Sequence, residues 1–201
     1  MPRFVLASAS PARLAVLQRA GIDPEVIVSG VDESVLDHLP PAELAGQLAV
    51  LKNAAVAGGV DDALVLGCDS VLEFEGQALG KPADAAEATA RWQAMRGRSG
   101  VLHTGHALQD TASNQVVTAT VSTTVHFADV TDAEIAAYVA SGEPLHVAGA
   151  FTIDGLGGAF ITHIEGDHHN VIGLSLPTLR RLVTELGHSW VGLWRSAASS
   201  T

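Results

Sequence analysis

The sequence predicts an α/β protein with a mixed, elongated sheet and helices packed against it. Three observations support this class. The chain opens with an apolar strand that turns at once into a helix. Its middle section, 101–127, is rich in Val and Thr and is interrupted by a short polar turn, which indicates an antiparallel hairpin. Another helix follows late in the chain, and we expect a cleft between the outer and inner halves of this arrangement.

Length and composition predict one domain, 1–201, or two small lobes that share a core. With 47% hydrophobic and 16% charged residues, the chain can bury a sizeable core, which argues against disorder. Its net charge of −11 argues against nucleic acid or an anionic membrane as a partner, because both require a basic surface. A small anionic ligand remains compatible with this charge where a few Lys and Arg converge.

The cysteine content and the lengths of the apolar runs indicate the cellular compartment of the protein. Cys68 is the single cysteine, which excludes an internal disulfide and a multi-Cys zinc site. Its apolar strand favours a core position over a nucleophile. No apolar run approaches the ~18 residues of a membrane span, so we expect none. The sequence therefore predicts a reducing, cytoplasmic setting.

The first half of the chain reads as strands alternating with helices. After an apolar strand at 4–7, Ser10 is suited to cap a helix, with Pro11 at its first position and Gly21 at its end. The next expected elements are a strand at 25–28, a helix at 41–57, a buried strand from 63 that ends at Asp69, a strand and turn at 71–77, and an Ala-rich helix at 84–95.

The second half contains the hairpin and the last two helices. Strands at 101–108 and 115–127 flank the polar turn, and Thr131 caps a helix to 140 with Glu134 at the capping-box spacing. The remaining expected features are a Gly-rich stretch at 148–158, a helix from about Ser175 to Leu186, and a frayed polar tail at 196–201.

The first strand-to-helix turn has the composition of an anion site. Small residues between a strand and a helix leave backbone N–H groups unpaired, and the helix dipole adds to their attraction for anions. Ser8 and Ser10 contribute hydroxyl groups, and Arg13 lies in the first helical turn, within reach of a phosphate. An ordinary capped helix with a surface Arg explains the same residues, because caps are common.

Two carboxylates follow predicted strands. Asp69 comes after a strongly apolar run, and Glu33 comes after the strand at 25–28. Mg²⁺ prefers one or two carboxylates together with substrate phosphates, which these residues could supply. A carboxylate in this position could instead orient or deprotonate an attacking water, or simply cap a turn.

The lysines are candidate phosphate ligands because the chain has only Lys52 and Lys81. Lys81 stands in a turn after a strand, and Lys52 stands late in a helix; a solvent-exposed role fits either one equally. The Gly80–Lys81 pair is not a Walker A loop, since Pro82 replaces the required Ser or Thr. The run 155–158 is not a dinucleotide fingerprint, because it lacks the third glycine at the required spacing.

The histidines do not predict a metal site. His163, His168 and His169 lack the i, i+4 helical spacing of a metalloprotease, so we expect no zinc site there. The histidines of the hairpin are expected to be half-exposed sheet residues; they are His103, His106 and His126.

Taken together, these motifs resemble the Maf family of nucleoside triphosphate pyrophosphatases. The resemblance runs from Leu6 to Leu182 and keeps the family's motif order. Its motifs are Leu6–Arg13 for the Ser-x-Ser-Pro-Arg-Arg turn, Val31–Glu33 for the acidic element, Lys52–Ala54 for the helical lysine, Gly67–Val71 for Asp followed by Thr or Ser, Gly80–Pro82 for Gly-Lys-Pro, and Ser141–Pro144, Ala148–Phe151 and Asn170–Leu174 in the C-terminal half.

The resemblance implies two lobes around a nucleotide cleft, commonly in a homodimer. It implies hydrolysis of a nucleoside triphosphate to the monophosphate and pyrophosphate with Mg²⁺, Mn²⁺ or another divalent cation, as part of nucleotide-pool house-cleaning. It makes Asp69 the catalytic carboxylate and Glu33 its partner at the metal site. The residues that it assigns to the triphosphate are Lys52, Lys81, Arg13 and the Ser8–Ser10 turn.

Two departures from the family pattern matter. Ala12 replaces the first Arg of the usual pair, which removes a phosphate donor and leaves a second interpretation open: a nucleotide-binding regulator of cell division with little catalysis. Asp154 stands where the family often has Gln or Glu near the base. A carboxylate there can accept N–H groups from a pyrimidine, as in dTTP or UTP, or from a modified purine, so the preferred base stays open.

Overall fold

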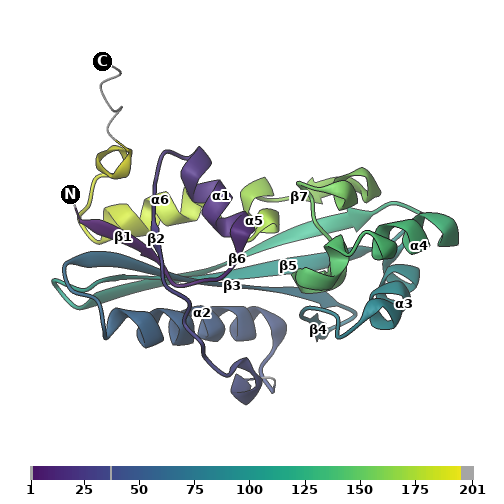
Figure 1. Cartoon of the computed structure of the whole chain (residues 1–201), viewed down its shortest axis with the longest axis horizontal. Coiled ribbons are helices and arrows are strands. Elements are labelled where there is room, and N and C mark those ends of the chain that lie inside the picture. The colour runs from purple at the N-terminus through teal and green to yellow at the C-terminus, as the bar shows by residue number, and fades with distance from the viewer. Residues whose placement is uncertain (1, 37, 196–201) are drawn as a thin grey trace.

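A seven-stranded mixed sheet forms the centre of the protein, in the order β2-β1-β3-β5-β6-β7 with β4 beside β3 (Figure 1). The computed structural model describes residues 2–36 and 38–195, so the tail expected to fray, 196–201, lies outside the described residues. The strands are β1 Arg3–Leu6, β2 Glu25–Val26, β3 Ala63–Phe74, β4 Gln77–Leu79, β5 Ser99–Asp110, β6 Gln115–Phe127 and β7 Ile161–Glu165. β1 pairs in parallel with β2 and β3, and the other pairings are antiparallel, which confirms the predicted mixed α/β class.

Helices cover both faces of this sheet. They are α1 Pro11–Arg19, α2 Pro41–Ala57, α3 Ala85–Met95, α4 Asp132–Ala140, α5 His168–Ile172 and α6 Leu176–Glu185, with short 3₁₀ turns η1 Glu33–Leu36, η2 Glu143–His146, η3 Ala148–Ala150, η4 Leu156–Phe160 and η5 Val191–Leu193. α2 lies on one face, and α1, α5 and α6 lie on the other (Figure 1). α3 and α4 gather at the far end of the long strands.

Local signals explain where several helices begin. The Ser10 side chain accepts the N–H of Arg13 at the start of α1, and Ser175 plays the same part for α6. Thr131 and Glu134 form the complete capping box expected at α4. Each cap satisfies N–H groups that the first turn leaves without a partner inside the helix.

Two large clusters of buried side chains lie along the sheet, and the parts of the fold around them are called the first and second lobes below. One cluster joins β1, β3 and β5 to α1 and α6. The other surrounds Trp92 of α3, which is fully buried. The rings of Phe127, Tyr138 and Phe160 meet Trp92 edge-on at 5.5–5.8 Å between centroids. These clusters give each lobe its own core on one shared sheet.

The prediction that a strand ends at Asp69 is wrong. β3 continues without a break to Phe74, and the turn falls at Glu75 and Gly76. β5 pairs with β3 all the way from Leu64 to Glu73, and this ladder of hydrogen bonds holds the polar Asp69–Ser70 step in the strand. Asp69 therefore lies in mid-strand.

Two glycines allow α2 to approach the sheet very closely. A Cβ on Gly67 would lie 2.2 Å from the Ala49 carbonyl oxygen, and one on Gly105 would lie 2.1 Å from that of Ala45. Real Cβ atoms are not found at such distances, so only glycine fits at either position. The close contact holds the middle of α2 directly over β3 and β5.

Gly105→Ala is therefore expected to lower the free energy of unfolding by about 2–3 kcal/mol, because α2 must move away from the sheet. Urea unfolding followed by circular dichroism measures the loss. Gly58→Ala is the matched control, since its nearest neighbour would be 3.9 Å away, and it should leave stability unchanged or raise it by up to about 1 kcal/mol. Equal stability in the two variants would contradict this account of the contact.

Candidate functional site

The candidate site lies where one edge of β3 has no neighbouring strand within the described residues. β1 follows this edge only as far as Leu66, with a last backbone bond from Ala7 N–H to the Leu66 carbonyl at 2.8 Å. β4 joins the same edge at Leu72. The interval between them, Gly67–Val71, is called the β3 window below. Successive side chains of a strand point to opposite faces, so Asp69 and Ser70 enter different sides of this window.

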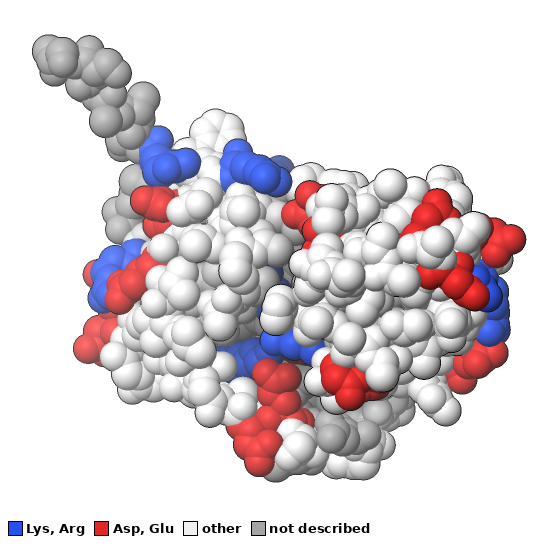
Figure 2. Space-filling view, turned by 45° about the vertical axis from the view of Figure 1, so that its right-hand side comes forward, with Lys and Arg blue, Asp and Glu red and all other residues white. Residues whose placement is uncertain are grey.

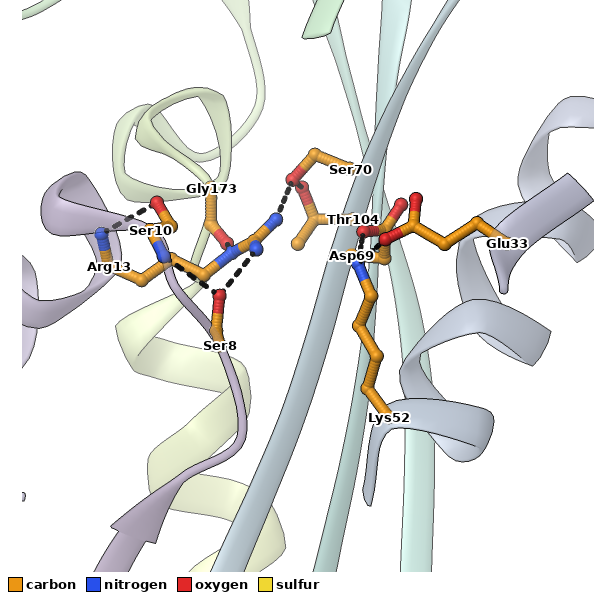
Figure 3. Close-up of polar contacts among 9 residues, drawn as sticks. All are labelled: Ser8, Ser10, Arg13, Glu33, Lys52, Asp69, Ser70, Thr104 and Gly173. Carbon is orange, nitrogen blue, oxygen red and sulfur yellow. Dashed lines mark hydrogen bonds and ion pairs between the residues drawn. The ribbon is translucent and has the colours of Figure 1, made fainter. Parts of the chain in front are cut away.

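Three charged residues meet on the α2 side of the window (Figure 3). Lys52 Nζ lies 2.7 Å from Glu33 Oε1 and forms a hydrogen-bonded ion pair with Asp69 Oδ1. The Lys52 and Asp69 side chains are 11% and 12% exposed, whereas the Glu33 side chain is 53% exposed. One buried ammonium thus stands between two carboxylates. The contact of α2 with Gly67 places Lys52 within reach of Asp69.

Glu33 reaches the site in a different way from the one predicted. The preceding strand, β2, covers only Glu25–Val26, and Glu33 opens the 3₁₀ turn η1 instead of directly following a strand. Contacts between η1 and α2 hold this turn beside the lysine-bearing helix. Three separate segments, η1, α2 and β3, therefore supply the cluster of Glu33, Lys52 and Asp69.

Arg13 occupies the opposite side of the window (Figure 3). Its guanidinium donates from Nη1 to Ser8 Oγ at 3.1 Å, from Nη2 to Ser70 Oγ at 3.0 Å and from Nε to the Gly173 carbonyl at 2.8 Å. Arg13 is 8% exposed. These bonds join the turn before α1, β3 and the turn after α5.

Sequence reasoning missed the part played by Ser70 and Gly173 around Arg13. The Ser70 hydroxyl also bonds to Thr104 Oγ1 at 3.0 Å, and Thr104 is fully buried. The available signal was strand alternation: a polar residue next to Asp69 in a continuous strand must face the side of the sheet opposite to Asp69. The carbonyl of Gly173 carried no side-chain signal.

Arg13→Ala is expected to destabilise the protein as well as weaken a bound anion. Hydrogen bonds from a charged donor contribute about 1.5–3 kcal/mol each, so we expect a total loss of at least about 3 kcal/mol. Urea unfolding measures it. Arg19→Ala, at the other end of α1, is the control, because no bond to its side chain is found among the described residues. A loss below about 0.5 kcal/mol would place Arg13 outside this network.

Ser8 and Ser10 organise the turn that was predicted to receive a phosphate. Ser8 Oγ accepts the backbone N–H of Ser10 at 3.2 Å in addition to the Arg13 bond, and Ser10 Oγ accepts the N–H of Arg13 at 3.4 Å. The turn is thus fixed by its own hydroxyl groups beside the buried guanidinium.

Lys81 stands just beyond the other end of the window. β4 runs antiparallel to β3 and ends at Leu79, so the chain returns toward Asp69 as it reaches Lys81. The Gly80 carbonyl accepts N–H groups from Gly149, at 3.0 Å, and from Arg91, at 2.6 Å, which fixes the turn. Lys81 is exposed, and within residues 2–36 and 38–195 its ammonium has no ion pair.

Asp154 belongs to the second lobe. It is exposed in the bend between Phe151 and η4, and in the described part of the chain its carboxylate has neither a hydrogen-bond partner nor an ion pair. The structure therefore leaves this carboxylate available, outside the clusters around Lys52 and Arg13.

Positive side chains line a groove between the lobes although the chain is acidic overall. Figure 2 shows Lys and Arg atoms along the floor of this groove and Asp and Glu atoms at its lower end. The net charge of the chain is −11. Clefts concentrate the field of the charges that line them, so an anion can enter here despite the overall charge.

Two hairpin histidines are buried, which corrects the expectation that they are half-exposed. His103 lies between Ser122 Oγ, 2.8 Å away, and Glu73 Oε2, 2.9 Å away. His106 is 1% exposed, and burial together with the nearby Arg13 charge lowers its pKa to about 4. Its neutral ring accepts the Ser175 N–H at 2.9 Å, so it supports the start of α6. Cys68 is buried, as predicted.

The carboxylates of Glu33 and Asp69 fit one side of a Mg²⁺ coordination shell. One oxygen of each already converges on a single cation, the Lys52 ammonium. Within the described residues no three His, Cys, Asp or Glu side chains form a metal-binding group. Substrate phosphates and water would have to complete the shell, which is the usual way in which proteins bind Mg²⁺.

Comparisons with known proteins identify the family of the chain. The family model described as "Maf-like protein" matches residues 3–186. A "Nucleoside triphosphate pyrophosphatase" from Streptomyces avermitilis is 64% identical over 96% of this chain and 94% of its own. One of the same name from Salinispora tropica is 59% identical over 98% of this chain and 90% of its own. A solved HAM1 protein from Coxiella burnetii is 19% identical, with a TM-score of 0.47 over 92% of this chain and 100% of its own. The extent of the family match and the identity to the two bacterial pyrophosphatases establish that the chain belongs to the Maf-like protein family.

Proposed function

We propose that this protein is a nucleoside triphosphate pyrophosphatase that hydrolyses a nucleotide to the monophosphate and pyrophosphate. The observation that carries the proposal is the β3 window, where Asp69 with Lys52 and Glu33 on one side faces Arg13 with Ser8 and Ser70 on the other. A triphosphate needs both a carboxylate near its reacting phosphorus and several cations along its length. Relatives that share most of the chain carry the corresponding name.

Asp69 acts on the attacking water. Its Oδ1 bonds to Lys52, and Oδ2 has no hydrogen-bond partner among the described residues. Oδ2 accepts a proton while the water oxygen forms a bond to the α-phosphorus. The bond from that phosphorus to the α,β-bridging oxygen breaks, and pyrophosphate leaves. The hydrogen bond from Lys52 holds the Asp69 carboxylate in position for this proton transfer.

The remaining cations bind the triphosphate. Lys52, on the α2 side of the window, and Lys81, beyond the end of the window that β4 joins, neutralise its charge, and Arg13 contributes its positive field from the opposite side of β3. The N–H groups of the Ser8–Ser10 turn and the start of α1 that do not already donate to the Ser8 and Ser10 hydroxyl groups hold one phosphate, as helix N-termini do for anions. Ala12 contributes no side-chain donor to this cradle.

Asp69 and Glu33 would hold a divalent cation, Mg²⁺ or Mn²⁺. Bound there, the cation would neutralise phosphate oxygens and strengthen the polarisation of the α-phosphorus. If they held it, the two carboxylates would give up some of their contact with the Lys52 ammonium, which would then be free to approach a phosphate.

Asp154 is proposed to meet the base. An exposed carboxylate accepts N–H groups, which pyrimidines such as those of dTTP and UTP and modified purines both offer. The protein is further proposed to work in the cytoplasm as a homodimer on the nucleotide pool. No described helix is long and apolar enough to cross a membrane.

The test is to incubate the pure protein with Mg²⁺ and a panel of nucleoside triphosphates that includes dTTP, UTP and methylated nucleotides. We expect equimolar pyrophosphate and monophosphate from at least one of them, and no orthophosphate. The absence of both products for the whole panel would overturn the proposal. Nucleotide binding without turnover, unchanged in Ala12→Arg, would indicate the regulatory role instead.

A further inference from the structure

The carboxylate of Glu143 closes a loop of the second lobe. Glu143 opens η2, and its Oε1 accepts the Tyr138 hydroxyl at 3.0 Å, the Thr152 hydroxyl at 2.5 Å and the Gly157 N–H at 3.0 Å. Its Oε2 accepts the Leu156 N–H at 2.9 Å. One side chain therefore ties α4 to both ends of the segment Thr152–Gly157, which is called the 152–157 loop below.

The glycines of this loop make room for the carboxylate. A Cβ on Gly155 would lie 2.6 Å from Glu143 Oε2, and one on Gly157 would lie 2.3 Å from the Tyr138 hydroxyl oxygen. Side chains at either position would push the loop off Glu143. This explains the Gly-rich run that fits no dinucleotide fingerprint: it lets the backbone wrap around a carboxylate.

Glu143 is charged when it holds the loop. Burial disfavours the charged form, but the bonds from Thr152, Gly157, Leu156 and Tyr138 outweigh it and keep the pKa of Glu143 below its usual value. A group with a lowered pKa in the folded state stabilises that state above its unfolded pKa and loses this effect as the pH falls. The bonds are therefore fully formed at neutral pH.

The chain segment that carries the loop is fixed beside the end of the β3 window. Gly149 donates its N–H to the Gly80 carbonyl, next to Lys81, and its Cα packs so tightly on Leu72 of β3 that a Cβ would lie 2.6 Å from Leu72 Cδ2. Trp92 Nε1 donates to the Ala150 carbonyl at 2.7 Å. The 152–157 loop thus starts from the end of the β3 window, and the unpaired Asp154 lies within it.

From these contacts we propose that Glu143 is the positioning residue of nucleotide recognition: it holds the 152–157 loop so that Asp154 meets the base. The assignment rests on the proposed function, because it takes a nucleotide as the ligand of the groove. Glu143 itself does not touch the substrate. Without its bonds the backbone of the loop is free to move, and the Asp154 carboxylate is spread over many positions.

Glu143→Gln is the sharpest test, because it keeps one acceptor oxygen and the size of the side chain while an NH₂ group meets the Leu156 N–H. We expect KM for the preferred nucleotide to rise about tenfold while kcat changes less than about threefold. The difference in kcat/KM between the preferred nucleotide and the others should become smaller as well. Asp154→Asn should reproduce both effects, and the double variant should be no worse than the larger single one, because both act on one contact.

Glu134→Gln is the matched control. The Glu134 carboxylate also accepts hydrogen bonds within the second lobe, from the N–H and hydroxyl groups of Thr131, but it serves only the cap of α4. Hydrogen exchange reports directly on the loop: the N–H groups of Leu156 and Gly157 should lose protection in Glu143→Gln and keep it in Glu134→Gln.

Two outcomes would overturn the proposal. One is an unchanged KM and nucleotide preference in Glu143→Gln, whatever the exchange data show. The other is an equal rise of KM in Glu134→Gln, which would trace the effect to the stability of the lobe. If the wild type binds nucleotides without turnover, the proposed function fails, and Kd from calorimetry takes the place of KM in the same comparison.

Discussion

Asp69→Asn is expected to lower kcat by about 10²–10⁴-fold, because an amide cannot accept the proton of the attacking water. The fold should persist, since the Asn carbonyl oxygen can still accept the bond that Asp69 Oδ1 receives from Lys52. KM should change much less than kcat, since the proton moves only during the reaction. Steady-state release of pyrophosphate, together with urea unfolding, measures both properties.

Asp61→Asn is the control for this change. It removes the same charge from an exposed position in the turn before β3, away from the window. Its kcat should stay within about twofold of the wild type. A similarly small change in Asp69→Asn would remove Asp69 from the catalytic role and leave it as the partner of Lys52.

Lys52→Met is expected to give the largest loss of stability among the site variants. It leaves the Asp69 carboxylate, 12% exposed, without its counter-ion, and breaking a buried ion pair typically costs about 3–5 kcal/mol. Turnover should fall as well, because both Asp69 and the phosphates lose a cation. Urea unfolding at neutral pH measures the stability, and pyrophosphate release measures the turnover.

A second substitution distinguishes the loss of stability caused by the broken ion pair from the loss caused by poorer packing. Lys52→Met combined with Asp69→Asn should recover most of the stability, because no unpaired charge remains in the site. Lys81→Met is the control for stability, since Lys81 is exposed, and it should change the free energy of unfolding by less than about 0.5 kcal/mol. A double variant as unstable as Lys52→Met alone would contradict the role of the ion pair.

Lys52→Met also tests the proposed divalent-cation site, by a measurement that does not depend on activity. Once Lys52 is removed, Glu33 and Asp69 are free to bind a divalent ion. Millimolar Mg²⁺ should then raise the melting temperature of Lys52→Met more than that of the wild type, because ligands that bind only the folded state stabilise it. An equal rise in the two proteins would argue against these carboxylates as metal ligands.

Several elements could be predicted because their signals are local. The bounds of α2 agree with the predicted helix at 41–57, and the capping box of α4 appears as Thr131 and Glu134 predict. The turn between β5 and β6 falls at the polar residues expected there. Caps, turns and apolar runs act over a few residues, so a single stretch of sequence contains the whole signal.

The sequence predictions that the structure overturned share a different cause. The Asp69–Ser70 step looks like the end of a strand, but pairing with β5, more than thirty residues later in the chain, keeps it extended. The sequence predicts His103 and His106 as half-exposed sheet residues, but His103 binds Glu73 and His106 accepts a hydrogen bond from the start of α6, and both are buried. In each case the deciding partner is remote in sequence, and a local pattern contains no information about it.

The sequence by itself determined the family resemblance, the mixed α/β class and the charged residue types that a polyphosphate site requires. Only the tertiary structure decided how those residues meet. Close packing of α2 on two glycines of the sheet brings the Lys52 ammonium between Glu33 and Asp69. On the other side of β3, the fold places the Arg13 guanidinium within hydrogen-bond distance of three acceptors, in Ser8, Ser70 and Gly173. The physical reason is that charges interact through space over a few ångströms, whereas these side chains stand far apart along the chain.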